Sequence, residues 1–161
     1  AKSGSLRAAL ELAQRVSGQP LRKGQPIRCP SDVQAHFETR IRHLRRESFH
    51  ALLLDGRHRL ISVEEVSVGT LTASLVHPRE VFREAIRCAA GAVLVVHNHP
   101  SGDPRPSSED RLVTSRLRAA GELVGIEVVD HVIVAHEGYY SFREAGEMAP
   151  MASPKGIASL S

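Results

Sequence analysis

The sequence predicts an α/β fold of the α+β type, a single domain in which helices flank a mixed β-sheet. Segments with the period of an amphipathic helix alternate with short apolar strands, but they form no regular βαβ repeat. Two apolar runs on either side of Asp55-Gly56 indicate a hairpin early in the chain. The uninterrupted apolar run at residues 92–96 is typical of a strand buried on both faces.

The chain opens with a pattern that predicts a helix over residues 6–16, stopped by Gly18 and Pro20. Residues 18–30 contain two Gly and three Pro and are typical of a linker. We therefore divide the chain into three parts: residues 1–27, a helix and linker; residues 28–146, the main domain; and residues 147–161, a flexible C-terminal tail.

The main domain contains four predicted strands, three helices and a final hairpin end. In chain order these are a helix at 31–44 capped by Ser31-Asp32, strands at 49–54 and 59–67, a helix at 78–88, a strand at 92–96, a helix at 109–121, a strand at 126–134 and a hairpin end at 138–141. Their periodicity places Leu44, Ile86 and Leu112 on the inner faces of the three helices.

Composition excludes several classes of protein. With 42% hydrophobic and 24% charged residues, the 161-residue chain can bury a proper core. Aromatic residues make up 4% and Trp is absent, which argues against stacking platforms for single-stranded nucleic acid. No apolar run is long enough to span a membrane and no signal-peptide pattern is visible. Two distant cysteines, Cys29 and Cys88, suggest no disulfide framework, so a reducing cytoplasm is the default.

The net charge of +3 is unevenly distributed. Residues 1–59 hold 12 Lys and Arg against 5 Asp and Glu, whereas the remainder holds 9 against 13. The excess is concentrated in the basic segment, residues 40–46. This segment could contact nucleic acid or another polyanion, but a solvated helix face is the commoner explanation of such a run.

The most informative motif is His97-Asn98-His99, followed by a Pro/Gly/Ser loop and then by Asp110. On an extended chain, residues two apart point to the same side, so both imidazoles can face one ion. The loop is long enough to return a carboxylate to them. Two His and one Asp leave a fourth tetrahedral position for water, which is the pattern of a catalytic zinc site.

Each of these residues also has a purely structural explanation. Ser107 and Asp110 fit a capping box, and a carboxylate turned toward a metal could not also cap fully. Asp103 competes as a ligand, but it lies in a turn sequence and ranks below Asp110. Asn98 should point away from the histidines and could pin the loop. His131 is more easily explained as a core histidine or a partner of a ligand than as a fourth ligand. Spacing alone leaves the metal site and the structural explanation evenly balanced.

The spacing His97-x-His99-x(7)-Ser107-x-x-Asp110 is identical to the signature of the JAMM (MPN-plus) metallopeptidases, which this chain resembles. Over residues 28–146 it is similar to the bacterial RadC family, in the segments 52–55, 68–70, 77–85, 97–103, 130–134 and 140–142. The resemblance implies a JAMM/MPN domain with cytidine-deaminase-like layering, one Zn²⁺ per chain and a bacterial cytoplasmic protein. RadC proteins carry a helix-hairpin-helix DNA-binding region before this domain, and residues 1–27 would be its truncated end.

The resemblance also assigns roles. Glu47, in the context Arg45-x-Glu47-x-Phe49, corresponds to the catalytic glutamate, although such a residue is otherwise usually a surface charge. Ser107 would donate to the oxyanion, and its structural alternative is the helix N-cap. The implied function is a zinc-dependent hydrolase that attacks a peptide or isopeptide carbonyl with metal-bound water, acting on a peptide or protein substrate.

The alternative is a binding module associated with DNA repair or recombination, in which the metal is structural. DNA would then be contacted through the missing N-terminal region or the basic segment. A zinc deaminase is disfavoured, because that chemistry needs H-x-E and P-C-x-x-C motifs that the chain lacks.

Overall fold

The computed structural model describes residues 20–69 and 76–148. The helix expected over residues 6–16 and the tail beyond 148 lie outside the described residues. The described elements are α2 (Pro30–Glu38), β1 (Glu47–Leu54), β2 (Leu60–Gly69), α3 (Pro78–Arg87), β3 (Ala92–Asn98), α4 (Ser108–Val124), β4 (Glu127–Ala135) and β5 (Gly138–Ser141). Among the described helices, none has both the length and the apolar character that crossing a membrane requires.

The strands form one five-stranded sheet in the order β2-β1-β3-β4-β5. β1 pairs antiparallel with both β2 and β3, β3 pairs parallel with β4, and β4 pairs antiparallel with β5. The parallel pair is connected through α4, because a crossover between parallel strands needs a long connection. The sheet is therefore mixed, which confirms the predicted α+β class and the early hairpin.

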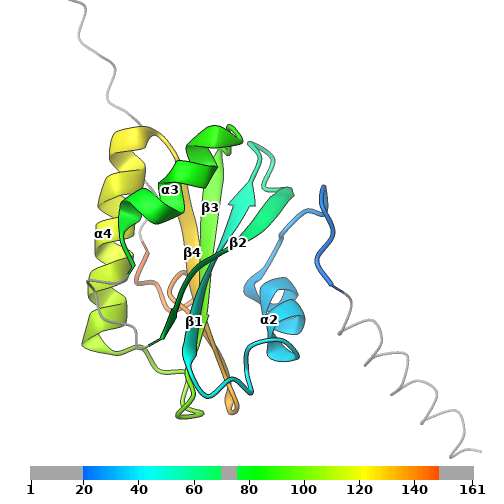
Figure 1. Ribbon diagram of the computed structural model, residues 1–161, viewed down its shortest axis with the longest axis vertical. Helices are drawn as coiled ribbons and strands as arrows, with labels where there is room; N and C mark the ends of the chain where they lie inside the picture. The colour runs from blue at the N-terminus through cyan, green and yellow to red at the C-terminus, as the bar shows by residue number, and fades with distance from the viewer. Residues whose placement is uncertain (1–19, 70–75, 149–161) are drawn as a thin grey trace, which may run out of the picture.

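Helices cover both faces of the sheet, with α3 and α4 on one side and α2 on the other (Figure 1). Alternation along β1 sends Phe49, Ala51 and Leu53 into the core beneath α3 and α4, and Leu52 and Leu54 into the core beneath α2. β3 is buried along its whole length, as its apolar sequence predicts. Its two faces thus enter two different cores.

Helix α2 is shorter than predicted. It ends at Glu38, and the chain continues in turns in which Ile41 is buried and Leu44 half-buried. The apolar spacing persists through these turns, which is why periodicity overextended the helix. The cap also differs, because Cys29 is the N-cap and the Asp32 carboxylate at the third helical position accepts its backbone N–H.

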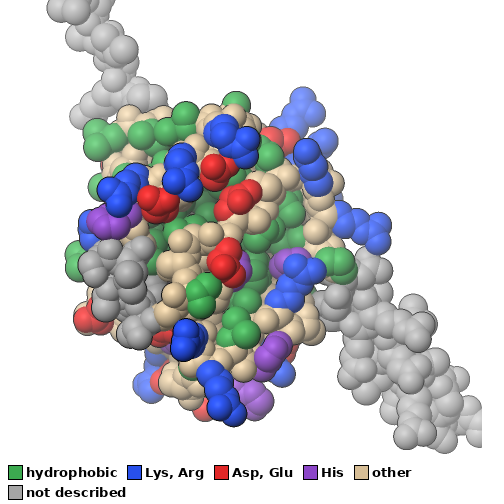
Figure 2. Space-filling model, in the orientation of Figure 1, with side chains coloured by type: hydrophobic (Ala, Val, Ile, Leu, Met, Phe, Trp, Pro, Cys, Tyr) green, Lys and Arg blue, Asp and Glu red, His purple; other side chains and the backbone are tan. Residues whose placement is uncertain are grey.

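Two residues assigned to inner helix faces point outward. Ile86 is 59% exposed and Leu112 is 53% exposed. The buried positions of α3 are Val81, Phe82 and Ala85, a stripe narrow enough that the next residue around the helix faces solvent. Charged side chains of both signs are interleaved over α3 (Figure 2), where Arg83 contacts Glu80 and Glu84.

A buried histidine fastens the segment before α2 to the domain. The Nδ1 atom of His36 accepts a hydrogen bond from the backbone N–H of Leu21 at 2.8 Å, and its side chain is almost fully buried. Burial, reinforced by Arg40 and His50, lowers the pKa of His36 to about 4. A proton on Nδ1 would face the Leu21 N–H and break this contact, so the folded protein holds His36 neutral.

We expect His36 to make stability pH-dependent. Because the unfolded chain binds this proton near pH 6.5 and the folded chain only near pH 4, stability falls as the pH drops through that interval. His36→Asn keeps an acceptor but does not titrate. Between pH 7.5 and pH 5, the parent should lose about 2 kcal/mol more unfolding free energy than this variant in urea titrations, at 1.36 kcal/mol per pKa unit. Equal losses would contradict the account.

Candidate metal centre

Three ionisable side chains meet where β3 ends and α4 begins. His97 is fully buried near the end of β3, His99 follows the strand, and Asp110 lies in the first turn of α4. The His97 Nε2 atom lies 3.0 Å from His99 Nε2 and 3.1 Å from Asp110 Oδ1. The distance from His99 Nε2 to Asp110 Oδ2 is 3.3 Å. Among the described residues, this is the one cluster of three His, Cys, Asp or Glu side chains that could hold a metal ion.

The donor atoms fit a tetrahedral ion. Bonds of about 2.0–2.1 Å to zinc place neighbouring ligands about 3.4 Å apart. The observed separations of 3.0, 3.1 and 3.3 Å approach that value. Two imidazoles and one carboxylate are also the donor set of a catalytic zinc site, which keeps a position open. His99 is the partly exposed member, with 11% of its side chain accessible.

Hydrogen bonds fix the orientation of both imidazoles. The Nδ1 atom of His99 lies 2.9 Å from the backbone carbonyl of Asp103, which can only accept, so His99 carries its proton there and leaves Nε2 bare. The Nδ1 atom of His97 lies 2.8 Å from Nε2 of His131, a fully buried residue of β4. The Nε2 atoms of both rings thus face Asp110.

Asp110 faces the histidines and closes the capping box at the same time. Its Oδ2 atom accepts from the backbone N–H and the hydroxyl of Ser107, both at 2.7 Å, while its own N–H bonds back to that hydroxyl. Its Oδ1 atom faces His97. One carboxylate therefore makes both sets of contacts, and Oδ2, which caps the helix, also lies 3.3 Å from His99 Nε2.

The electrostatics keep Asp110 ionised. Burial alone would favour its neutral form, but the facing imidazoles of His97 and His99 and the hydrogen bonds from Ser107 hold the pKa of Asp110 far below its ordinary value. Burial lowers the pKa of His97 against the opposing pull of Asp110. Burial also opposes protonation of His99, yet Asp110 and the Asp103 carbonyl raise the pKa of this ring above its usual value.

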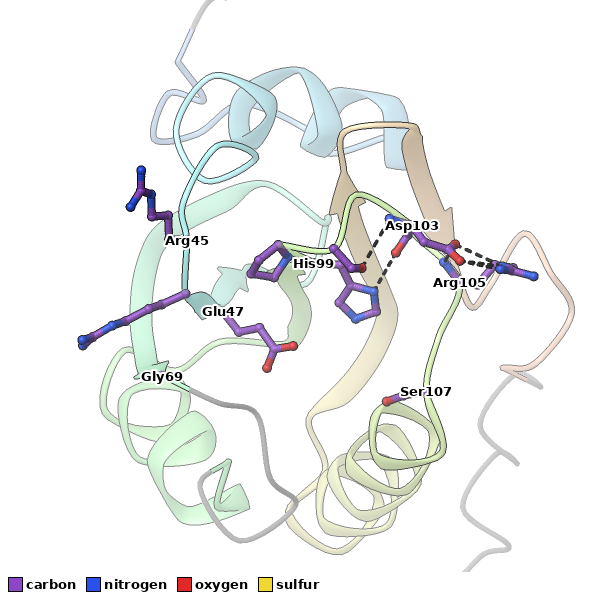
Figure 3. Close-up of a pocket in the computed structure, with 10 residues that line it drawn as sticks. Arg45, Glu47, Gly69, His99, Asp103, Arg105 and Ser107 are labelled. Atoms are coloured by element: carbon purple, nitrogen blue, oxygen red, sulfur yellow. Dashed lines mark hydrogen bonds and ion pairs between the residues drawn. The ribbon is translucent and has the colours of Figure 1, made fainter.

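The cluster opens on a pocket of about 770 Å³. Its lining includes His99, Ser107 and Glu47, the first residue of β1. Figure 3 shows the Glu47 side chain pointing into this pocket, toward the side where Ser107 lies at the start of α4. The remaining lining residues come from the segment before β1, the end of β2 and the loop after β3: Arg45, Arg46, Gly69, Pro100, Ser101, Asp103 and Arg105.

The side chain of Asn98 holds the backbone on both sides of Glu47. Its amide oxygen accepts from the N–H of Ser48 at 2.7 Å, and its amide nitrogen donates to the carbonyl of Arg46 at 3.0 Å. Strand alternation turns Asn98 to the face opposite His97, as expected, and there it pins the segment that presents Glu47. Sequence analysis singled out Asn98 without identifying this partner.

The other candidates occupy less central positions. The Asp103 carboxylate is bound to Arg105, with a shortest distance of 2.6 Å, and only its backbone carbonyl contacts the cluster. His131 contacts His97 but lies outside the group of possible ligands. In the basic segment, Arg42 is paired with Glu38, while Arg40, Arg45 and Arg46 are exposed.

Thr114 is a residue that sequence analysis missed. It lies one helical turn after Asp110, is buried, and contacts His131 Nδ1 at 2.6 Å. The sequence did contain an indication of this role. Thr114 lies four residues after Asp110 and so shares its face of α4, and a polar side chain on the inner face of a helix needs a hydrogen-bond partner.

Comparison with known proteins gives a consistent answer. The family described as RadC-like JAB domain matches residues 27–147. A UPF0758 protein from Syntrophotalea carbinolica is 52% identical over 146 residues, which are 91% of this chain and 64% of the relative. A UPF0758 protein from Symbiobacterium thermophilum is 53% identical over 146 residues, covering 91% of the chain and 62% of the relative.

A third relative, a UPF0758 protein from Clostridioides difficile, is 48% identical over 144 residues, or 89% of this chain and 60% of its own length. The chain therefore spans somewhat less than two thirds of these curated relatives. The family match over most of the chain and the level of identity lead to one conclusion: the chain belongs to the RadC family and contains its RadC-like JAB domain.

Proposed function

We propose that this domain is a zinc-dependent hydrolase that cleaves a peptide or isopeptide bond. One observation carries the proposal: a two-His, one-Asp cluster of metal-ligating geometry opens on a pocket into which a glutamate outside the cluster also points. Hydrolysis by this route needs such a glutamate as a general base that is not itself a ligand. The proposed ligands are His97, His99 and Asp110.

A zinc ion bound by these residues would supply Lewis acidity, which polarises a carbonyl and acidifies a water molecule. The chain's own groups then move the proton. Glu47 accepts a proton from the attacking water as the new C–O bond forms. It returns that proton to the leaving nitrogen as the C–N bond breaks, so that a carboxylic acid and an amine result.

Ser107 is proposed to donate a hydrogen bond to the oxyanion of the tetrahedral intermediate. Its hydroxyl lines the pocket but donates to Asp110 at 2.7 Å, so this role requires the hydroxyl to turn from Asp110 to the substrate. The backbone N–H of Ser107, which also bonds to Asp110 at 2.7 Å, would keep the carboxylate in place meanwhile.

We expect Ser107→Ala to lower kcat about 10²-fold while zinc content stays close to that of the parent, because only the hydroxyl is removed. Steady-state cleavage of an internally quenched peptide and zinc analysis of the same sample measure the two effects. The control is Ser108→Ala, which removes a neighbouring hydroxyl that bonds to Glu109. Parent-like kcat in Ser107→Ala would assign Ser107 to helix capping alone.

The substrate, a peptide or protein, and a cytoplasmic location are part of this proposal. Contact with DNA through the basic segment is the alternative, supported by the exposed Arg40, Arg45 and Arg46. Because Arg45 and Arg46 also line the pocket, they could equally contact an acidic part of a substrate. Binding of a DNA duplex that weakens steeply with salt and is lost on replacing the three arginines with serine would favour the alternative.

A further inference from the structure

The inner face of the cluster continues into a buried chain of hydrogen bonds. His97 Nδ1 contacts His131 Nε2 at 2.8 Å, and His131 Nδ1 contacts the Thr114 hydroxyl at 2.6 Å. That hydroxyl in turn donates to the backbone carbonyl of Asp110 at 2.6 Å. These hydrogen bonds therefore connect the side chain of His97, one proposed ligand, to the backbone of Asp110, another.

The direction of every bond in this chain follows from its last acceptor. A carbonyl oxygen can only accept, so the single hydroxyl proton of Thr114 points to Asp110. Thr114 must then accept from His131, which places the His131 proton on Nδ1. The ring of His131 is fully buried and bonds to no carboxylate of residues 20–69 and 76–148, so it is neutral and its Nε2 is bare. His97 therefore donates from Nδ1, and its own Nε2 carries a lone pair.

Packing fixes the His131 ring in the position that this series of hydrogen bonds requires. The ring stacks on Phe142 with centroids 4.9 Å apart and planes 6° apart, and it meets the edge of Phe49 at 5.6 Å. Asp130, which precedes His131 in β4, accepts from the hydroxyl of Ser141 on the neighbouring strand β5 at 2.6 Å and thereby fastens β5, which leads to Phe142. The imidazole is thus fixed on its face, its edge and both nitrogens.

We propose that Thr114 and His131 are positioning residues that set the tautomer of His97 so that its Nε2 is ready to bind a metal ion. A threonine hydroxyl that bonds to the carbonyl four residues back is common in helices. The second contact, to His131, is what links this bond to the ligand. The inference rests on the proposed metal site, and it assigns to the carbonyl of Asp110 a role separate from that of its carboxylate.

Two variants of Thr114 test whether its hydroxyl sets the tautomer of His97 through His131. Thr114→Val keeps the shape but removes the hydroxyl, whereas Thr114→Ser keeps the hydroxyl and is the matched control. Zinc-loaded protein is titrated with a chromophoric chelator to measure the affinity for zinc. Thr114→Val should bind zinc about 10-fold or more weakly, the usual cost of losing such an outer partner, and Thr114→Ser within about threefold of the parent.

A second measurement uses the parent protein alone, so it does not depend on whether a variant folds. In zinc-loaded parent protein labelled with ¹⁵N-histidine, NMR reports which nitrogen of each ring carries the proton. We expect His131 to be protonated at Nδ1 and bare at Nε2. The opposite tautomer, or parent-like zinc affinity in Thr114→Val, would overturn the inference. A parent protein that binds no zinc would instead contradict the proposed function itself.

Discussion

Replacing Glu47 with glutamine is expected to lower peptide hydrolysis by about 10²–10⁴-fold, the range that general acid–base catalysis supplies. Glutamine keeps the size of the side chain and its hydrogen-bonding capacity, but it cannot accept and return a proton. Zinc content and unfolding free energy should remain close to those of the parent, because Glu47 is not among the proposed ligands and Asn98 still holds the backbone around it.

The matched control is Glu122→Gln, which makes the same chemical change at an exposed position of α4. Cleavage by this variant should equal that of the parent. If Glu47→Gln hydrolyses the same quenched peptides and ε-linked lysine isopeptides at the parent rate, Glu47 is not the general base. The proposal that the domain binds its partner without chemistry would then gain support.

Replacing Asp110 with asparagine is expected to have the second largest effect, this time on the metal. The variant keeps an oxygen that can accept from the Ser107 N–H, so α4 should still begin at the same place. It loses the negative charge that faces both histidines. Loss of a residue that hydrogen-bonds to a metal ligand typically lowers metal affinity about 10–100-fold, and the loss of zinc affinity in this variant should be larger.

Glu109→Gln is the control for this variant, because Glu109 lies in the same helical turn but is exposed, and its carboxylate accepts a hydrogen bond from the Ser108 hydroxyl. Chelator titration and circular dichroism distinguish loss of the metal from loss of the fold. Parent-like zinc affinity in Asp110→Asn would remove Asp110 from the ligand set and reopen the assignment of the third ligand.

Much of the fold follows from local patterns. The apolar run of β3 predicted a strand buried on both faces, and Asp55-Gly56 marked the β1–β2 hairpin. The end of α2 could not be read in this way, because Ile41 continues the helical spacing within a turn. Apolar spacing reports which side chains are buried, and it does not distinguish a helix from a compact turn that buries the same residues.

The candidate site, too, could be predicted from the sequence only in part. Short-range spacing made His97, His99 and Asp110 candidates for one cluster, since one strand end and one helix start carry all three, and the family resemblance favoured the metal site over a structural explanation. The partners of these residues come from distant segments. His131 belongs to β4, and Asn98 reaches across to the start of β1, so their contacts depend on strand register, which a single sequence does not specify.

Zinc content is the measurement that tests the central claim most directly. The chain should be purified without added metal and analysed by plasma mass spectrometry beside the His97→Ala/His99→Ala double variant. We predict close to one zinc per parent chain and almost none in the variant, with both proteins folded by circular dichroism. Little metal in the parent, even after Zn²⁺ is offered, would contradict the account.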